Sequence, residues 1–187
     1  MVHAHPPVLL ELDGDSWSAQ VDRVERWLAT TRMLQSGYRD MLDSILDDVA
    51  EPHIKAYLTE LRDVAREHED RVDDLYRAFG REPGHPGAVR SAGATVLSKT
   101  RQVVGHLEGA TGGAASGPWR ILRELLLTNL DAISGFAATE QLGLALGNPA
   151  VTDITVPILT EKSEHQLQLQ ELLLEMAANA ILYQRDT

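Results

Sequence analysis

Two histidines interrupt helical rows of apolar residues, and the residue three positions before each of them is informative. His68 follows Ala65, and His165 follows Lys162. A carboxylate and an imidazole three residues apart share one face of a helix, and pairs of this kind hold metal ions in the cores of helix bundles. Neither Ala65 nor Lys162 is a carboxylate, so neither histidine has such a partner. The sequence therefore indicates polar residues buried among apolar ones in the core.

Two further polar residues lie at comparable depth in other segments. Gln35 interrupts the first apolar row of the chain, and Asn129 interrupts the third. Proline disfavours helical geometry in the residue before it, so Pro52 predicts a turn between the first two rows. Gln35 and His68 each lie roughly 16 residues from that turn, which puts them at one level of an antiparallel helical hairpin. We therefore expect the segments to bring their polar residues together.

Four long helices must position these residues, and the apolar spacing predicts them. Each row places a residue of the same face every three or four positions, which is the repeat of an amphipathic helix. The rows run from Val21 to Val49, from Ile54 to Phe79, from Leu122 to Gly147 and from Ile158 to Asn179. The third row consists of Leu122, Leu126, Asn129, Ile133, Phe136, Glu140, Gly143 and Gly147.

Capping residues, prolines and glycines predict where the helices end. Asp15 or Ser16 can cap the first helix, Gly80 closes the second, and Pro118 suits the first turn of the third. The fourth helix either starts near residue 155 or starts earlier and bends at Pro157, and the sequence leaves both possibilities open.

The arrangement of the segments predicts one helical domain. Residues 1–14 lack periodicity and are expected to form a flexible arm, while residues 15–187 form the domain. The connection over about 81–117 contains a possible helix at 88–107. A helix of about 30 residues is roughly 45 Å long, so a connection of this size can return the chain to the starting end of a bundle. We therefore predict an all-α four-helix bundle with a long crossover between helices 2 and 3.

The charge balance limits the partners that we expect. The chain of 187 residues has 28 acidic and 17 basic residues, and its net charge of -11 repels phosphate backbones and anionic lipid surfaces. It contains no cysteine, which excludes disulfides and thiolate ligands. No segment reaches the roughly 18 apolar residues of a membrane span. We therefore expect a cytoplasmic protein without nucleic-acid or membrane partners.

The chain resembles the ferritin-like superfamily, and within it the YciF-type, rubrerythrin-like stress proteins. The segment from Arg71 to Pro83 is similar to the end of that family's second helix. The spacing from Phe136 to Gly147 is similar to its third helix, where the aromatic position is usually tyrosine. The resemblance spans roughly residues 20 to 180. It implies a four-helix bundle built around two metal ions.

The resemblance also implies which positions would hold those metal ions. The superfamily places a glutamate on the first and third helices and Glu-x-x-His on the second and fourth. The corresponding residues here are Gln35, Asn129, Ala65-x-x-His68 and Lys162-x-x-His165. The Glu-His-x-Glu of the family's third helix reads Asn-Leu-Asp-Ala at 129–132. All four carboxylates that would neutralise two divalent cations are therefore replaced.

Three interpretations of the polar layer compete. In the first, the layer is structural and fixes the register of the bundle through hydrogen bonds among its side chains and with buried water. The side chains of this layer are Gln35, His68, Asn129 and His165. In the second, different ligands hold iron, manganese or zinc; they are His68, His165, Glu161, Glu140 and Glu164. In the third, a remodelled pocket binds an organic ligand between Tyr38, Phe136, Met33 and the two histidines.

Lys162 bears on all three interpretations, because an ammonium group can supply the positive charge that a metal ion would supply. We expect it to pair with Glu140 or Glu161 inside the bundle, and we expect Gln35, Asn129 and Lys162 to contact any bound organic ligand.

The preferred interpretation is a ferritin-like bundle without the usual dimetal site, which has no cofactor and acts as a non-catalytic stress-related or ligand- or partner-binding protein. The alternative is a metal-binding oxidoreductase or metal store with an atypical His/Glu site. Leu167, Leu173 and Leu174 widen the apolar arc of the last helix, which indicates either a second helix contact inside the bundle or a dimer surface. We expect a homo-oligomer.

Overall fold

Four α-helices make up the residues that the computed structural model describes, 13–83 and 117–183. They are α1 (Gly14–Ile45), α2 (Pro52–Ala78), α4 (Pro118–Ala145) and α5 (Pro149–Ile181). These two ranges contain no β-strand, which confirms the predicted all-α class. The predicted arm, apart from its last two residues, and the possible helix over 88–107 lie outside the described residues.

The helix ends follow the capping chemistry, with one correction. The first helix is capped by Asp13, not by Asp15 or Ser16: Asp13 has an extended backbone, and its Oδ1 accepts a hydrogen bond of 2.7 Å from the Ser16 amide. Gly80 follows α2 with a φ of 69°, as the predicted end requires. The last helix starts at Pro149 and continues through Pro157, so the earlier of its two predicted starts is confirmed.

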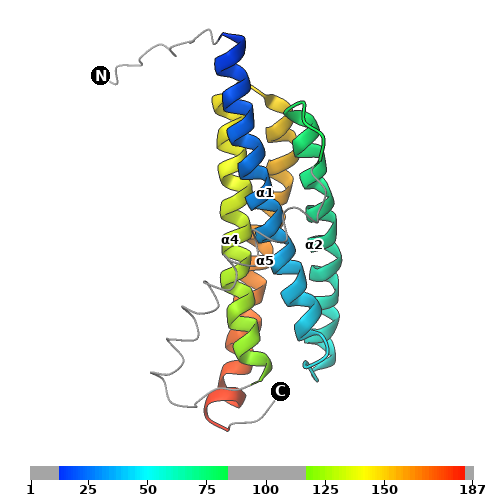
Figure 1. Ribbon diagram of the computed structural model, residues 1–187. Helices are drawn as coiled ribbons and strands as arrows, with labels where there is room; N and C mark the ends of the chain where they lie inside the picture. Colours follow the sequence, from blue (N-terminus) through cyan, green and yellow to red (C-terminus); the bar gives the residue numbers. More distant parts are fainter. Residues whose placement is uncertain (1–12, 84–116, 184–187) are drawn as a thin grey trace, which may run out of the picture.

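The helices form an antiparallel bundle in which neighbours run in opposite directions (Figure 1). Helix α1 packs against α2 and α4, and α5 packs against α4 and α2. The end of α2 and the start of α4 lie at opposite ends of the bundle (Figure 1). The chain between them therefore joins the two ends, which is the crossover that the sequence predicts between the second and third long helices.

The core consists of two apolar clusters with the polar residues between them. The first cluster includes Tyr38, Leu42, Leu58, Leu125 and Leu169, and the second includes Leu28, Val72, Phe136, Val151 and Ile158. The buried face of α4 differs from its predicted row, since Leu125, Ala132 and Thr139 are buried in place of Leu126, Ile133 and Glu140. The predicted Glu140 therefore lies at the edge of the bundle and not in its centre.

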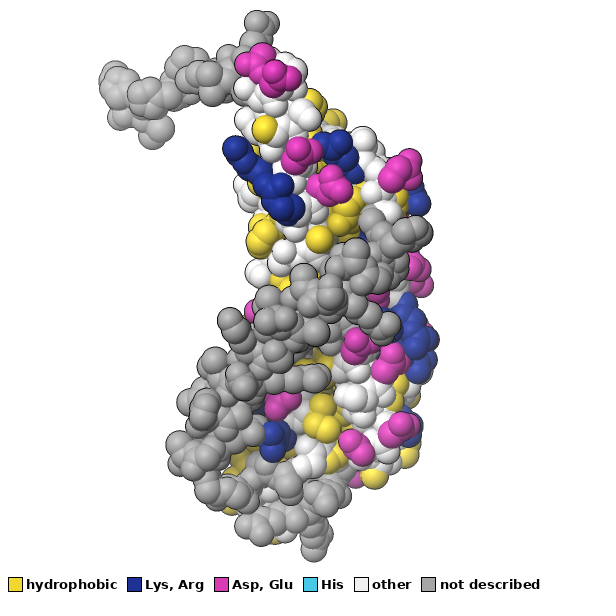
Figure 2. All heavy atoms as spheres, viewed as in Figure 1, with side chains coloured by type: hydrophobic (Ala, Val, Ile, Leu, Met, Phe, Trp, Pro, Cys, Tyr) yellow, Lys and Arg dark blue, Asp and Glu magenta, His cyan; other side chains and the backbone are white. Residues whose placement is uncertain are grey.

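The outer surface of α1 and α2 is charged. Arg39 Nε lies 2.6 Å from Glu69 Oε2, and Arg66 lies 3.1 Å from Asp43. Acidic and basic side chains are interleaved on this side of the molecule (Figure 2). Such exposed ion pairs between neighbouring helices contribute roughly 0–1 kcal/mol each, so they favour solubility more than stability.

Candidate functional site: a buried polar layer around Lys162

Among the residues that the structure describes, seven polar side chains are buried in the core of the bundle. They are Thr31, Gln35, His68, Asn129, Thr139, Thr155 and Lys162. All four helices contribute to this layer, as the sequence predicts for Gln35, His68, Asn129 and Lys162. Burying a polar group is unfavourable unless it finds a hydrogen-bond partner, so the partners of each group decide what the layer can do.

Lys162 is the most unusual member, because its side chain has no exposed surface. Its Nζ donates a hydrogen bond of 3.2 Å to Asn129 Oδ1 and lies 4.3 Å from the centre of the Tyr38 ring. The predicted ion pair with Glu140 or Glu161 is not formed among the described residues. The ammonium group is therefore held by an amide oxygen and an aromatic face, without a carboxylate to balance its charge.

Asn129 connects Lys162 to the backbone of α5. Its Nδ2 donates to the Lys162 carbonyl at 3.2 Å and to Gln166 Oε1 at 2.8 Å, while its Oδ1 accepts from the lysine amine. An amide can donate and accept at once, so Asn129 satisfies two oxygen acceptors that a glutamate carboxylate at this position would leave without a donor. The asparagine and the lysine therefore fit each other chemically.

His68 pairs with an acidic side chain of α5. Its Nε2 lies 2.8 Å from Glu161 Oε2, and its ring packs edge-on against Phe136 at 6.5 Å between ring centres. A carboxylate only accepts hydrogen bonds, so the histidine nitrogen carries the proton and donates it. The side chain of His68 is 5% exposed and that of Glu161 is 52% exposed, which places the pair at the edge of the layer next to solvent.

Burial and the charge of Lys162 set the protonation of the layer. Burial lowers the pKa of Lys162 to about 7. The pKa of His68 falls to about 4, first because of burial and then because of the positive charge of Lys162, although the hydrogen bond to Glu161 opposes this. Burial and then Lys162 also lower the pKa of His165. Near neutral pH the layer therefore holds neutral imidazoles and an amine that readily loses its proton.

Threonines hold α1 against α4 beside this layer. The Thr31 hydroxyl lies 3.2 Å from the Gly135 carbonyl and 3.2 Å from the Thr139 hydroxyl. A Cβ added at Gly135 would lie 3.4 Å from Thr31, which is an ordinary van der Waals contact, so the helices pack closely here without requiring glycine. The sequence analysis did not single out Thr139, because a threonine one turn after a glycine also suits an exposed position.

Two polar atoms of α1 in the layer have no hydrogen-bond partner. They are the Tyr38 hydroxyl and Gln35 Oε1, although Gln35 Nε2 donates to the Ala65 carbonyl at 2.8 Å. Burial also raises the pKa of the Tyr38 hydroxyl, which keeps it a donor. Tyr38 and Phe136 both pack within the apolar clusters. The layer thus retains unused donor and acceptor capacity next to Lys162.

The described residues fit a metal ion poorly. They contain no group of three or more His, Cys, Asp or Glu side chains arranged to hold one. Among the predicted ligands, only His68 and Glu161 are in direct contact, and His165 is partly buried on the same helix as Glu161. The charge of Lys162 would further oppose a cation, because it acts on both His68 and His165 and lowers the pKa of each.

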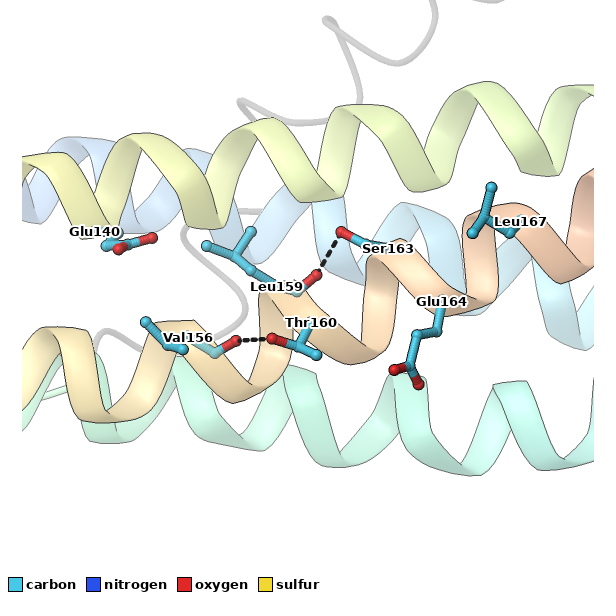
Figure 3. Close-up of a pocket in the computed structure, with 7 residues that line it drawn as sticks. All are labelled: Glu140, Val156, Leu159, Thr160, Ser163, Glu164 and Leu167. Atoms are coloured by element: carbon cyan, nitrogen blue, oxygen red, sulfur yellow. Dashed lines mark hydrogen bonds between the residues drawn. The ribbon is translucent and has the colours of Figure 1, made fainter.

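Glu140 and Glu164, the two remaining predicted ligands, line a groove on the outside of α4 and α5 instead. The groove has a volume of about 460 Å³. Figure 3 shows Glu140 reaching it from α4, while Val156, Ser163 and Leu167 come from α5. These two glutamates therefore face a surface groove and not the buried layer.

The described helices include none that is long and apolar enough to cross a membrane.

Comparison with known proteins supports the fold and leaves the function open. No family model matches the chain, and no curated protein matches it. The chain is similar to a solved two-domain protein from Anabaena variabilis that contains DJ-1/ThiJ/PfpI-like and ferritin-like domains, with a TM-score of 0.59 and 13% identity. The match covers 97% of this chain and 47% of that protein. The predicted ferritin-like four-helix bundle is confirmed, whereas the narrower resemblance to YciF-type proteins stays a prediction.

Proposed function

We propose that this chain is a metal-free, non-catalytic ferritin-like protein that acts by binding partners, including further copies of itself. A stress-related role is the setting that the resemblance to YciF-type proteins implies. The cytoplasm is the compartment that its composition favours.

The burial of Lys162 carries this proposal. A dimetal centre needs carboxylates to neutralise its charge. Here a lysine amine occupies the layer, and Asn129 and Tyr38 hold it without any carboxylate. The amine takes the central place that a metal ion would take, since side chains of α1 and α4 both contact it. It also repels a second cation.

Metal analysis of the untagged, purified protein tests the proposal directly. We expect far less than one equivalent of iron, manganese or zinc per chain, and no rise of the melting temperature when each metal is added. The Lys162→Glu variant restores one Glu-x-x-His sequence and removes the cation, so added metal should raise its melting temperature. Lys162→Met removes the cation without adding a ligand and serves as the matched control.

The alternative is a metal-binding oxidoreductase or metal store, and the contact between His68 and Glu161 is the observation that favours it. A divalent cation could replace the proton between these side chains, with His165 as a third ligand. One or two equivalents of metal in the wild type that disappear in a His68→Ala, His165→Ala double variant would establish this alternative and refute the metal-free function.

A further inference from the structure

One side of the α4–α5 pair carries a row of exposed uncharged side chains, next to Glu140 and Glu164 of the surface groove. On α5 these include Val156, Thr160, Ser163, Leu167, Leu174 and Ile181, which we call the α5 row. Leu167 is 64% exposed and Leu174 is 68% exposed. On α4, Leu127 and Leu130 are each 47% exposed. In a chain of which 24% is charged, an uncharged row along a whole helix differs sharply from the ion-paired surface of α1 and α2.

The polar members of the α5 row are satisfied by their own helix. The Thr160 hydroxyl donates to the Val156 carbonyl at 2.9 Å, and the Ser163 hydroxyl donates to the Leu159 carbonyl at 2.7 Å (Figure 3). Covering these residues with an apolar surface therefore leaves no hydroxyl donor unpaired. These two hydroxyl groups can be buried without the usual cost of leaving a polar donor unpaired.

The spacing of the row is the same in both directions. Successive positions of the row are four and three residues apart in alternation, beginning and ending with four. The row consists of positions 156, 160, 163, 167, 170, 174, 177 and 181. Two such rows in antiparallel helices match when the symmetry axis passes between Leu167 and Gln170. Val156 then faces Ile181 of the second copy, and Thr160 faces Ala177.

The same register pairs large side chains with small ones. Ser163 faces Leu174 of the second copy, and Ser163 lines the groove of about 460 Å³ on the α4–α5 surface. Leu174 is the more exposed of the two central leucines of the row, so it has no place within its own bundle. Glu140 and Glu164 also line this groove, and a leucine seated beside Ser163 in it makes the knob-into-hole contact of packed helices.

The surface is large enough for a specific interface. The row spans positions 156 to 181, which is about 38 Å of helix. Seven large apolar side chains of α4 and α5 are about half exposed, and they are Leu127, Leu130, Leu144, Val156, Leu167, Leu174 and Ile181. Together they present on the order of 600 Å² of apolar surface, and specific interfaces bury about 800 Å² per partner.

We propose that two copies of this chain associate through the α4–α5 surface, with their α5 helices antiparallel and Leu174 of each copy in the Ser163 groove of the other. This inference deepens the proposed function by naming its partner. Its tests measure association, so they are independent of the metal content that tests the metal-free centre.

Sedimentation of the full-length protein tests the association. We expect a species of twice the 20.6 kDa chain mass. Leu174→Glu should convert it to a monomer, and circular dichroism should show that the helices persist. Trp17→Glu is the matched control, because Trp17 is 44% exposed on α1, away from this surface, and should leave the dimer intact. A wild-type chain that is monomeric at all concentrations overturns the proposal.

Disulfide trapping tests the register. The chain has no native cysteine, so only the introduced cysteines can form a cross-link. Ser163→Cys with Leu174→Cys should form covalent dimers on mild oxidation. These two positions lie about 16 Å apart on one helix, too far for a bond within one chain. Ser163→Cys alone should not cross-link, since the antiparallel register separates the two serines by the same distance. Equal cross-linking of the single variant would refute the antiparallel arrangement.

Discussion

The burial of Lys162 predicts that its replacement by methionine stabilises the protein at neutral pH. Methionine has a similar length and flexibility but no charge, so it can occupy the same space in the bundle. The lysine side chain has no exposed surface, and its amine has one hydrogen bond and one aromatic contact. Removing an incompletely compensated charge from a core should therefore increase the free energy of unfolding.

The size of the effect follows from the pKa of the amine. Burial lowers it from 10.5 to about 7, and each pKa unit corresponds to about 1.4 kcal/mol. At pH 7 the buried amine therefore costs about 4 kcal/mol relative to the unfolded chain. Methionine leaves Asn129 Oδ1 without a donor and loses the attraction to the Tyr38 ring, each worth about 1 kcal/mol. We expect a net stabilisation of about 2 kcal/mol at pH 7.

The pH dependence separates this mechanism from an ordinary packing change. The folded pKa of Lys162 lies below its unfolded value, so the unfolded chain binds more protons between about pH 7 and 10.5. The wild-type protein therefore gains stability from this group as the pH rises through that window. The advantage of Lys162→Met should shrink by about 2 kcal/mol between pH 7 and pH 9.

Urea denaturation at pH 7, 8 and 9 measures this difference, with Lys55→Met as the control at an exposed lysine of α2. The chain has three lysines, so NMR of labelled lysine side chains can follow the titration of Lys162 directly. A methionine variant whose advantage is the same at pH 7 and pH 9 would refute the reasoning. So would a Lys162 amine that titrates at its ordinary value in the folded protein.

Two further predictions test other parts of the layer and its packing. The pKa of His68 is lowered to about 4, so the stability of the wild-type protein should rise between about pH 4 and 6.5. In urea denaturation over this pH range, the stability of His68→Gln should depend less on pH. An unchanged pH dependence in this variant would contradict the lowered pKa of His68. A Cβ at Gly143 would lie 2.6 Å from Val151, so Gly143→Ala should lower stability by about 2 kcal/mol in thermal denaturation. Gly135→Ala, whose Cβ meets atoms no closer than 3.4 Å, should be nearly neutral, and equal losses for the two variants would count against this packing.

The contrast between charged and apolar faces explains how well each helix could be predicted. On α2 the apolar row alternates with many charged residues, and the buried positions include Ile54, Leu61, His68 and Leu75, as predicted. On α4 both candidate faces are apolar, because Leu125 and Leu126 are adjacent and both rows have helical spacing. Periodicity alone does not distinguish these two faces of α4. The predicted row therefore contains Glu140, whereas the neighbouring Thr139 is the buried residue.

The buried layer could be located from the sequence, but its internal contacts could not. Interrupted apolar rows placed Gln35, His68, Asn129 and Lys162 in the core, and all four are buried. Charge complementarity predicted a carboxylate for Lys162, whereas its amine contacts Asn129 and Tyr38. Which partner a buried amine selects depends on side-chain directions across three helices, and helical spacing does not encode them.

The composition of the layer argues that lysine and metal exclude each other in this bundle. A dimetal centre balances about four positive charges with four buried carboxylates. In the described layer the one carboxylate in contact is Glu161, which is half exposed and already accepts the proton of His68. A divalent cation would have to displace that proton and lie beside the Lys162 amine with almost no negative charge to offset either. Loss of the amine proton, at a pKa of about 7, costs less free energy than binding a cation beside the amine. It leaves the layer close to neutral without any bound ion. If Lys162→Met is more stable, as we expect, then the lysine is not present for stability, and the metal-binding behaviour of Lys162→Glu is where its effect should appear.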